Sequence, residues 1–259
     1  MQNNFEIYVL GSGSKGNATL IKTRDTAVLI DAGISCRRIV EGLRGAGLEP
    51  ADLNGIFLTH EHIDHVAGLT VLSKQLPKVP IYANEKTWGK LKLRRELPLA
   101  QKRVLPRGFT LGNIKIVSFK ISHDAIDPVG YELFYGKEKC TYLTDSGYVT
   151  ERCRQALEGA STAILEANHD VEMLVHGPYP KILQDRILGK WGHLSNLTAG
   201  KILAQLAAPP GEVFLAHLSE KNNAPALAFK TVQDCWRQEH GNEALQIYVT
   251  RQNSVVSNK

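Results

Sequence analysis

The sequence predicts an α/β fold in which two β-sheets pack together and helices cover their outer faces. Short apolar runs typical of strands and amphipathic helical segments occur in two successive batches of similar design. No linker, repeat or low-complexity segment divides the 259 residues, so we expect a single domain over residues 1–259. A chain of this length can bury roughly 70–75% of its unfolded surface, so it needs no disulfide staples.

In the first batch, strand-like runs bounded by turn residues are followed by helical periodicity. The runs 18–22 and 27–31 are joined by a short turn at Arg24 and Asp25. Asn84 is a suitable N-cap for a helix that starts there. The predicted strands are 6–10, 18–22, 27–31, 55–59 and 81–82, and the predicted helices are 36–45, 69–75 and 84–95.

The second batch opens with four strand-like runs and then alternates helices with strands. The predicted strands are 109–111, 114–119, 130–135, 139–144, 162–166, 212–216 and 246–249. The predicted helices are 151–157, 197–206 and 224–239. Two sheet layers with helices outside are the simplest way to bury these apolar faces.

The composition is ordinary for a soluble globular enzyme, with 43% hydrophobic and 22% charged residues. No run approaches about 18 apolar residues, so no membrane span is expected. The first six residues lack a basic segment followed by an apolar one, so we expect no signal peptide and a cytoplasmic protein. The four cysteines are scattered without a CxxC pair and are expected to be reduced thiols.

Residues 59–65 concentrate metal-ligand side chains directly after an apolar run. His60, His62, Asp64 and His65 lie within six positions, although the whole chain has nine histidines. Imidazole and carboxylate groups suit zinc, manganese and iron. The alternative, a solvated loop with chance histidines, is disfavoured by this density. Because Asp64 stands where an HExxH motif has its second histidine, we expect the ligands on a turn rather than on one helical face.

Residues 11–16 match the GxGxxG pattern of dinucleotide-binding folds, and Asp31 follows at a suitable distance. The context fails, because a strand rather than a helix is predicted after Gly16. No GK[ST] triplet supports a Walker A motif either. The segment is therefore a tight turn that needs glycine, or a nest of backbone amides facing a substrate phosphate. In the second case Ser14 and Asn17 would contact the substrate.

Three further residues of the ligand type follow predicted strands. His123 is the only histidine between His65 and Asp145, and it comes after an apolar run. Asp145 follows the strand 139–144, and His217 follows the strand 212–216. A sheet would present such residues at one edge. Each alone could be a hydrogen-bonded loop residue, but their order after the cluster favours a site with two ions, which needs more donors than one turn supplies.

With these residues in this order, the chain resembles the metallo-β-lactamase-fold hydrolases over nearly its whole length. The pattern is His60-x-His62-x-Asp64-His65, followed by His123, Asp145 and His217. Within this superfamily the chain is most similar to the YycJ/WalJ group, which is similar to tRNase Z and to PhnP-type phosphodiesterases. The segments that carry this narrower resemblance are 11–17, 122–125, 166–170, 192–196 and 217–220.

The resemblance implies a four-layer αββα sandwich, the metallo-β-lactamase fold, with a dinuclear site at the sheet edges. It implies that His60, His62 and His123 bind one divalent ion, that Asp64, His65 and His217 bind the other, and that Asp145 bridges them. Two ions of zinc, manganese or iron would lower the pKa of a water between them, and Asp64 would orient this nucleophile. The reaction implied is phosphodiester cleavage rather than β-lactam opening.

His193 resembles the non-ligand histidine of the HST motif in tRNase Z, which makes it a candidate proton donor to the leaving alkoxide. The alternative is a structural residue beside a helix cap at Asn196. The segment 166–170 is less specific. His169 and Asp170 could bind phosphate, orient His193 or support the metal ligands, and a buried hydrogen-bonded loop is the alternative.

Basic residues gather in two stretches, and the chain carries a net charge of +5. Lys181, Arg186 and Lys190 lie just before His193. The other stretch contains a single acid, Glu96, and the basic residues Lys86, Lys90, Lys92, Arg94, Arg95, Lys102, Arg103 and Arg107. Phosphate backbones are recognised through such charge. A solvated helix face is the alternative.

The YycJ/WalJ resemblance implies a nuclease, namely a 5′→3′ exonuclease on double-stranded DNA, with DNA favoured over RNA as the partner. An RNA-processing enzyme or a small cyclic phosphodiesterase is the second candidate. A glutathione thioesterase ranks third because no thioester-binding motif is present. A non-catalytic interaction module with a structural metal site is the alternative from another class. The spare His193 argues against it, because structural zinc sites are closed and catalytic ones keep an open position.

Overall fold

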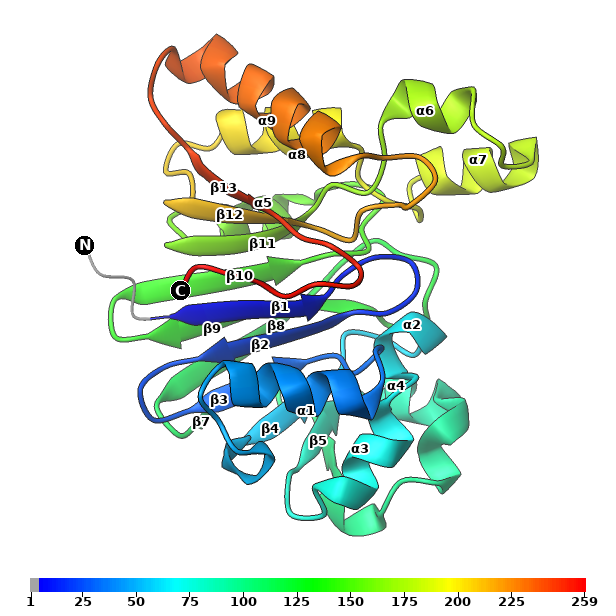
Figure 1. Cartoon of the computed structure of the whole chain (residues 1–259), viewed down its shortest axis with the longest axis vertical. Coiled ribbons are helices and arrows are strands. Elements are labelled where there is room, and N and C mark those ends of the chain that lie inside the picture. The colour runs from blue at the N-terminus through cyan, green and yellow to red at the C-terminus, as the bar shows by residue number, and fades with distance from the viewer. Residues whose placement is uncertain (1–4) are drawn as a thin grey trace.

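The computed structural model describes residues 5–259 and contains two seven-stranded sheets packed face to face. Helices α1 and α3 cover one outer face, and α8 and α9 cover the other (Figure 1). The predicted α/β class with two sheet layers between helices is therefore confirmed. Among the described residues, no helix has the length and apolar character needed to cross a membrane.

The first sheet is antiparallel at one end and parallel at the other. The pairs β14/β1, β1/β2 and β2/β3 are antiparallel, and β3/β4, β4/β5 and β5/β6 are parallel. In spatial order its strands are β14 (Val256–Ser257), β1 (Glu6–Gly11), β2 (Ala18–Lys22), β3 (Ala27–Ile30), β4 (Gly55–Phe57), β5 (Ile81–Ala83) and β6 (Lys102–Val104).

The second sheet repeats this design. The pairs from β7 to β10 are antiparallel, and the pairs from β10 to β13 are parallel. Its strands in spatial order are β13 (Gln246–Val249), β12 (Glu212–Ala216), β11 (Thr162–Glu166), β10 (Glu138–Leu143), β9 (Val129–Tyr135), β8 (Ile114–Lys120) and β7 (Gly108–Leu111). Every residue of β11 and β12 is buried, as expected for parallel strands covered on both faces.

The helices connect the strands and carry the site loops. On the first sheet they are α1 (Cys36–Gly45), α2 (Ile63–Val66), α3 (Leu69–Gln75) and α4 (Glu85–Lys90), with the short 3₁₀ turns η1 (Pro50–Asp52), η2 (Lys92–Arg95) and η3 (Leu99–Gln101). On the second sheet they are α5 (Glu151–Leu157), α6 (Val171–Val175), α7 (Lys181–Leu188), α8 (Asn196–Ala204) and α9 (Pro225–His240).

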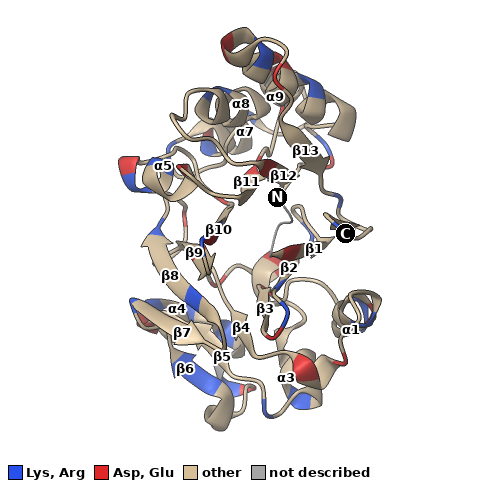
Figure 2. Ribbon diagram, turned by 90° about the vertical axis from the view of Figure 1, so that its left-hand side faces the viewer, with Lys and Arg blue, Asp and Glu red and all other residues tan. Residues whose placement is uncertain are grey.

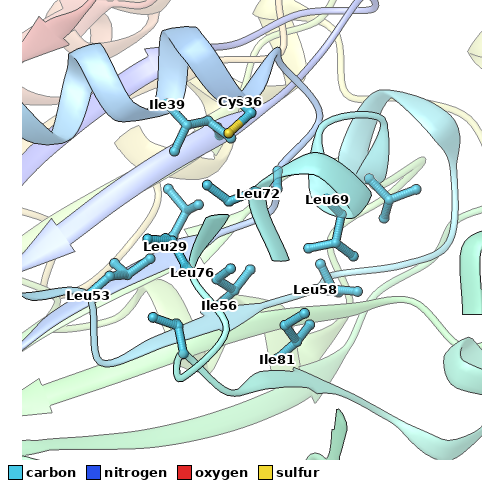
Figure 3. Close-up of a cluster of buried hydrophobic side chains, with 14 of the residues drawn as sticks. Leu29, Cys36, Ile39, Leu53, Ile56, Leu58, Leu69, Leu72, Leu76 and Ile81 are labelled. Carbon is cyan, nitrogen blue, oxygen red and sulfur yellow. The ribbon is translucent and has the colours of Figure 1, made fainter. Parts of the chain in front are cut away.

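Three clusters of buried apolar side chains hold the layers together. Side chains of both sheets, such as Ile7 and Phe214, meet in the cluster between them. Leu29 and Ile56 of the first sheet pack against Ile39 of α1 in a second cluster (Figure 3). The third joins the second sheet to α5, α8 and α9. Burial of this apolar area is the main force that stabilises the sandwich.

Two helix predictions need correction. The helix predicted over residues 84–95 ends at Lys90, because Leu91 adopts an extended conformation and buries its side chain. Trp88 is held there by a bond from its indole Nε1 to the carbonyl of Arg103, so packing overrides local propensity. At α8 the cap is Ser195 rather than Asn196, since its side chain accepts from the amide of Thr198.

Candidate metal centre

The ends of four strands deliver polar side chains to one place between the two sheets. Asp31 follows β3 and His60 comes shortly after β4, both in the first sheet. Asp145 comes shortly after β10, and His217 directly follows β12 in the second sheet. Because parallel strands end at a common edge, residues far apart in sequence converge there.

The structure brings together the residues that the sequence singled out as ligands. One ligand atom from each of His60, His62 and His123 lies within 4.8 Å of the others. The same holds for a second group, Asp64, His65 and His217. These are the two groupings that the resemblance implies, each with the donor types of a divalent metal site.

Asp145 lies between these two groups. One of its carboxylate oxygens, Oδ2, is 3.4 Å from Nε2 of His65, and the other, Oδ1, is 3.3 Å from Nδ1 of His217. Nε2 of His123 lies 3.9 Å from Oδ1 as well. A carboxylate in this position can face ions on both sides, which is the placement that a bridging ligand needs.

Three buried atoms of the site have no hydrogen-bond partner in the described part of the protein. They are Nε2 of His60, Nε2 of His217 and Oδ2 of Asp145. Leaving such groups unpaired in the interior costs free energy. Three lone-pair atoms directed into one site are instead what coordination of divalent cations requires, so the residues present fit a metal centre.

Backbone strain is concentrated at this edge. Asp31, Asp145 and His217 have φ values of 59°, 56° and 57°, and they are the only described non-glycine residues with positive φ. L-residues adopt this left-handed conformation at a cost. All three stand just beyond a strand of the site, so the strain turns their side chains toward it.

Asp31 orients two of the candidate ligands, although the sequence suggested no such role. Its Oδ2 lies 2.7 Å from Nδ1 of His65 and accepts from the hydroxyl of Thr59 at 2.9 Å. The Thr59 hydroxyl is also 3.0 Å from Nδ1 of His60. Both rings are thus held by Nδ1 and turn Nε2 toward the site. The sequence did contain a signal for this role. Asp31 is an acidic residue directly after an apolar strand, and Asp145 stands in a similar position after β10.

The charges of the site favour a cation. Burial alone would lower the pKa of His217, but the carboxylates of Asp145, Asp64 and Glu166 raise that pKa to about 10. Asp145, Asp31 and Asp64 likewise raise the pKa of His65 well above its usual value against the effect of burial. The negative field that stabilises a proton on these rings also stabilises a divalent ion beside them.

Glu166, at the end of β11, connects His193 to His217. Its Oε1 lies 2.8 Å from Nδ1 of His193 and 2.9 Å from Nδ1 of His217. Its Oε2 accepts from the amides of Ser146 and Leu194. Burial opposes its ionisation, yet the charges and hydrogen bonds of His193 and His217 hold the pKa of Glu166 below its usual range. Glu166 is therefore a carboxylate that fixes the ring of His193.

The glycine-rich segment is a turn that a strand follows, as predicted, and the structure shows it to be the loop of a hairpin. It joins β1 to β2, which pair antiparallel, and no helix follows it. The Asn17 amide hydrogen bonds to the carbonyl of Asp64, and its side chain accepts from Gly13. A Cβ at Gly33 would lie 1.6 Å from that Asp64 carbonyl, so only glycine allows the loops to approach. Asn17 is buried and braces the Asp64 turn.

A cavity of about 160 Å³ lies beside His193. Ser14 and Arg186, which were predicted to contact substrate, line it together with His193. The guanidinium of Arg186 pairs with Asp124, whose other oxygen is 3.4 Å from Nε2 of His123. Lys181 lies outside this lining and pairs with Asp185 of its own helix at 3.0 Å.

His169, which was predicted to contact substrate, is buried away from the cavity. Its ring is 1% exposed, is not part of the cavity lining, and has no hydrogen-bond partner on either nitrogen among the described residues. Burial lowers the pKa of His169 to about 4. Its backbone bridges to Ser195 and links this loop to the start of α8.

The basic stretch of residues 86–107 begins next to the loop that follows His123. Asn84, the cap of α4, donates from its side chain to the carbonyl of Asp127, in the loop after His123. Figure 2 shows the Lys and Arg residues of β6 in blue near α4 and β7. The side chain of Arg94 is not among those described. The exposed side chains of this stretch that form no ion pair with a described residue are Lys86, Lys90, Lys92, Arg95, Arg103 and Arg107.

Comparisons with known proteins show the family of the chain. Residues 26–218 match the model of the beta-lactamase superfamily domain. The chain is 40% identical over 228 residues to the exodeoxyribonuclease YycJ of Bacillus anthracis, which covers 86% of each chain. It is 38% identical over 234 residues to the exodeoxyribonuclease WalJ of Streptococcus pneumoniae serotype 2, covering 88% of this chain and 87% of that one.

Solved structures show the same fold. The metallo-beta-lactamase fold protein YhfI from Bacillus subtilis superposes with a TM-score of 0.72 at 19% identity. The match covers 99% of this chain and 100% of that one. At this level of identity the likeness concerns the fold, and the αββα sandwich implied by the sequence is confirmed.

Proposed function

Since this chain belongs to the metallo-β-lactamase superfamily and to its YycJ/WalJ group, we propose that it is a metal-dependent exodeoxyribonuclease. The proposed substrate is double-stranded DNA, cut from the 5′ end. The observation that carries the proposal is the position of His193, which lines a cavity directly beside the candidate ligands and is oriented by Glu166. A proton donor next to a metal centre is what hydrolysis of a phosphodiester requires.

The proposed cofactors are two divalent ions, of zinc, manganese or iron. His60, His62 and His123 would hold one ion, and Asp64, His65 and His217 the other, with Asp145 shared between them. When bound, such ions make a water nucleophilic near neutral pH and neutralise phosphoryl oxygens. Asp64 stands beside both His65 and His217, at 3.4 Å and 3.6 Å, and is suited to orient the nucleophile.

His193 would protonate the oxygen that leaves. Its Nδ1 faces the Glu166 carboxylate, which orients the ring and leaves Nε2 as the nitrogen that would donate the proton. Glu166 itself is held by two backbone amides, so the ring has little freedom to turn away. After each cut, His193 would recover a proton from solvent.

The proposal is tested by nucleotide release from 5′-labelled duplex DNA in the presence of manganese, zinc or iron. We expect metal-dependent release from the labelled end, and loss of release in Asp64→Ala and Asp145→Ala. RNA and small cyclic diesters belong in the same panel, because an RNA-processing enzyme or a cyclic phosphodiesterase is the second candidate. No cleavage of any of these substrates would instead support a non-catalytic protein with a structural metal site.

His193→Ala separates a proton donor from a ligand. His193 shares a possible ligand group with Asp145, Glu166 and His217, so both roles fit its position. If it donates the proton, the variant keeps its bound metal and loses about 10²- to 10⁴-fold in kcat. Metal content measured by inductively coupled plasma mass spectrometry decides the matter. Loss of metal in parallel with activity would make His193 a ligand.

A further inference from the structure

The cavity beside His193 is walled by the segment that contains α6 and α7. These two helices extend beyond the sheets, apart from α8 and α9 (Figure 1). Tyr179, Leu183, Ile187 and Trp191 supply apolar and aromatic wall to the cavity. One side of the cavity is therefore apolar and aromatic, whereas polar side chains such as Ser14, Asn168 and Ser219 line the rest.

Trp191 leaves much of its ring in water at this place. Its side chain is 52% exposed, whereas the other described tryptophans, Trp88 and Trp236, are buried. Its carbonyl accepts from the amide of Asp124, which anchors it to the loop of His123. The ammonium of Lys190 lies 5.2 Å from the ring centroid. The backbone of Trp191 is thus anchored beside the cavity, and much of the residue stays uncovered by the described residues.

The charge of the wall disfavours a phosphate as the natural occupant. Among the described residues, Arg186 is the only lysine or arginine that lines the cavity, and Asp124 neutralises it. Lys190, which lies against the Trp191 ring but does not line the cavity, has no acidic partner among the described residues, and further exposed cations of this kind, such as Lys90 and Lys92, lie on the stretch that starts at α4. A nucleic acid strand would therefore have its backbone on that stretch and at the metal centre, and an uncharged part of it in the cavity.

We propose that the cavity receives the base of the terminal nucleotide, unpaired from its partner strand and stacked on Trp191. This inference rests on the proposed nuclease function and specifies the form of its substrate. Every base has a π-face, so stacking on tryptophan or tyrosine is strong and tolerates any sequence. A base inside a duplex cannot leave its neighbours as easily as one at an end. The geometry thus selects frayed ends over duplex interiors.

Exposed apolar side chains on the neighbouring loops are consistent with binding of the frayed end of a DNA duplex. Three exposed side chains lie close in sequence to candidate ligands. Ile63 stands between His62 and Asp64. Ile126 comes three residues after His123, and Tyr148 three residues after Asp145. The amide of Ile126 hydrogen bonds to Glu61, which joins two of these loops. Their apolar surface would contact the exposed face of the last base pair.

The test combines a protein change with a substrate change. The substrates are a duplex with a normal terminal nucleotide and the same duplex with an abasic terminal nucleotide, both with a 5′-phosphate. In the wild-type protein, we expect loss of the base to raise KM by about 5- to 100-fold. In Trp191→Ala, KM for the normal duplex should rise by a similar factor, and loss of the base should then have little further effect.

Two variants control this experiment. Trp191→Phe keeps an aromatic face and should restore most of the affinity. Phe229→Ala removes a partly exposed aromatic side chain from α9 and should behave as wild type. Additive effects of Trp191→Ala and the abasic end, or a KM that responds to the 5′-phosphate and not to the base, would overturn the proposal.

A binding measurement separates this inference from the nuclease function. Stacking of a base on Trp191 should quench tryptophan fluorescence when a short single-stranded DNA is added, and the quench should vanish in Trp191→Phe. This readout requires binding alone. A protein that quenches but cuts no substrate would refute the nuclease and retain the base site, whereas a protein that cuts without the quench would refute the base site.

Discussion

Asp31 illustrates how a single residue can act on the site through its neighbours. Its carboxylate is fully buried and is bonded to Thr59 and to the ring of His65. Thr59 in turn contacts the ring of His60. One carboxylate therefore fixes candidate ligands of both metal groups, at the cost of a strained φ of 59°.

Asp31→Asn should weaken metal binding without removing a ligand. The amide keeps the shape of the side chain but loses the negative charge that holds Nδ1 of His65. Changes of this kind cost about 10- to 100-fold in metal affinity. Competition with a chromophoric chelator measures the effect. Asp234→Asn, on the exposed surface of α9, is the matched control, and equal affinities of the two variants would contradict the role of Asp31.

Because of His169, the free energy of unfolding should fall as the pH is lowered. The pKa of a free histidine is about 6.5, and burial lowers that of His169 to about 4 in the folded state. Below pH 6.5 the unfolded chain binds a proton that the folded chain refuses, so this contribution to stability falls until about pH 4. The loss is about 3 kcal/mol over this window.

Urea unfolding of the metal-free protein at pH 7 and pH 4.5 checks this expectation. His169→Asn should show a smaller loss of unfolding free energy than the wild type over this interval, because asparagine does not titrate. Working without metal keeps acid-driven release of ions out of the comparison. An equal pH dependence in both proteins would mean that the ring of His169 is protonated as freely in the folded state.

At the scale of elements, the contact between α8 and α9 depends on a glycine. A Cβ added to Gly200 would lie 2.9 Å from Cβ and Sγ of Cys235 and 3.1 Å from Cα of Val232. The two helices approach closely there because Gly200 has no side chain. The N-cap of α8 is Ser195, two residues after His193, so this packing supports the loop of the candidate proton donor.

Gly200→Val should destabilise the protein by about 1–3 kcal/mol, since a larger side chain forces the helices apart. Gly45→Ala is the counterpart in α1. A Cβ there meets no atom within 4 Å, and alanine favours helix by about 0.5–1 kcal/mol, so the variant should be as stable as wild type or more so. Chemical denaturation of both variants gives the comparison. A neutral Gly200→Val would show that the helices are not in contact as described.

For the whole molecule, the distribution of charge matters more than the net charge of +5. Many basic residues are already neutralised within the chain, among them Lys181 by Asp185 and Arg186 by Asp124. The exposed cations without an acidic partner among the described residues include Lys90 and Lys92, on the stretch that begins next to the loop that follows His123. DNA binding should therefore depend on this stretch.

The double variant Lys90→Gln, Lys92→Gln should reduce the salt dependence of DNA binding. The slope of log K against log salt changes by about 0.9 for each phosphate that a cation neutralises, so removing two cations should lower its magnitude by about 2. Fluorescence anisotropy of labelled duplex DNA over a range of salt concentrations measures it. Lys230→Gln, whose ammonium pairs with Asp234 on α9, should leave the slope unchanged. An unchanged slope in the double variant would show that Lys90 and Lys92 do not contact the DNA backbone.

The elements themselves followed from local patterns in the sequence. Most strands, and helices such as α1 over Cys36–Gly45, are where periodicity and caps predict them. The helices α6 and α7 were not predicted, because a segment with Gly177, Pro178 and Pro180 carries turn signals and little amphipathic periodicity. The cavity wall comes from α7 and from Tyr179 and Trp191 on either side of it, so a part of the fold that the sequence did not predict carries the proposed base site.

By itself, the sequence determined the family and the candidate ligands in their order, because histidine and aspartate at several strand ends form a pattern that is rare enough to notice. Only the tertiary structure revealed that Asp31 orients His65, that Glu166 joins His193 to His217, and that Arg186 is neutralised by Asp124. These pairs are 27 to 62 positions apart. Their contact depends on which strand ends lie next to each other at the edge of the sheets, and the local sequence does not specify this order.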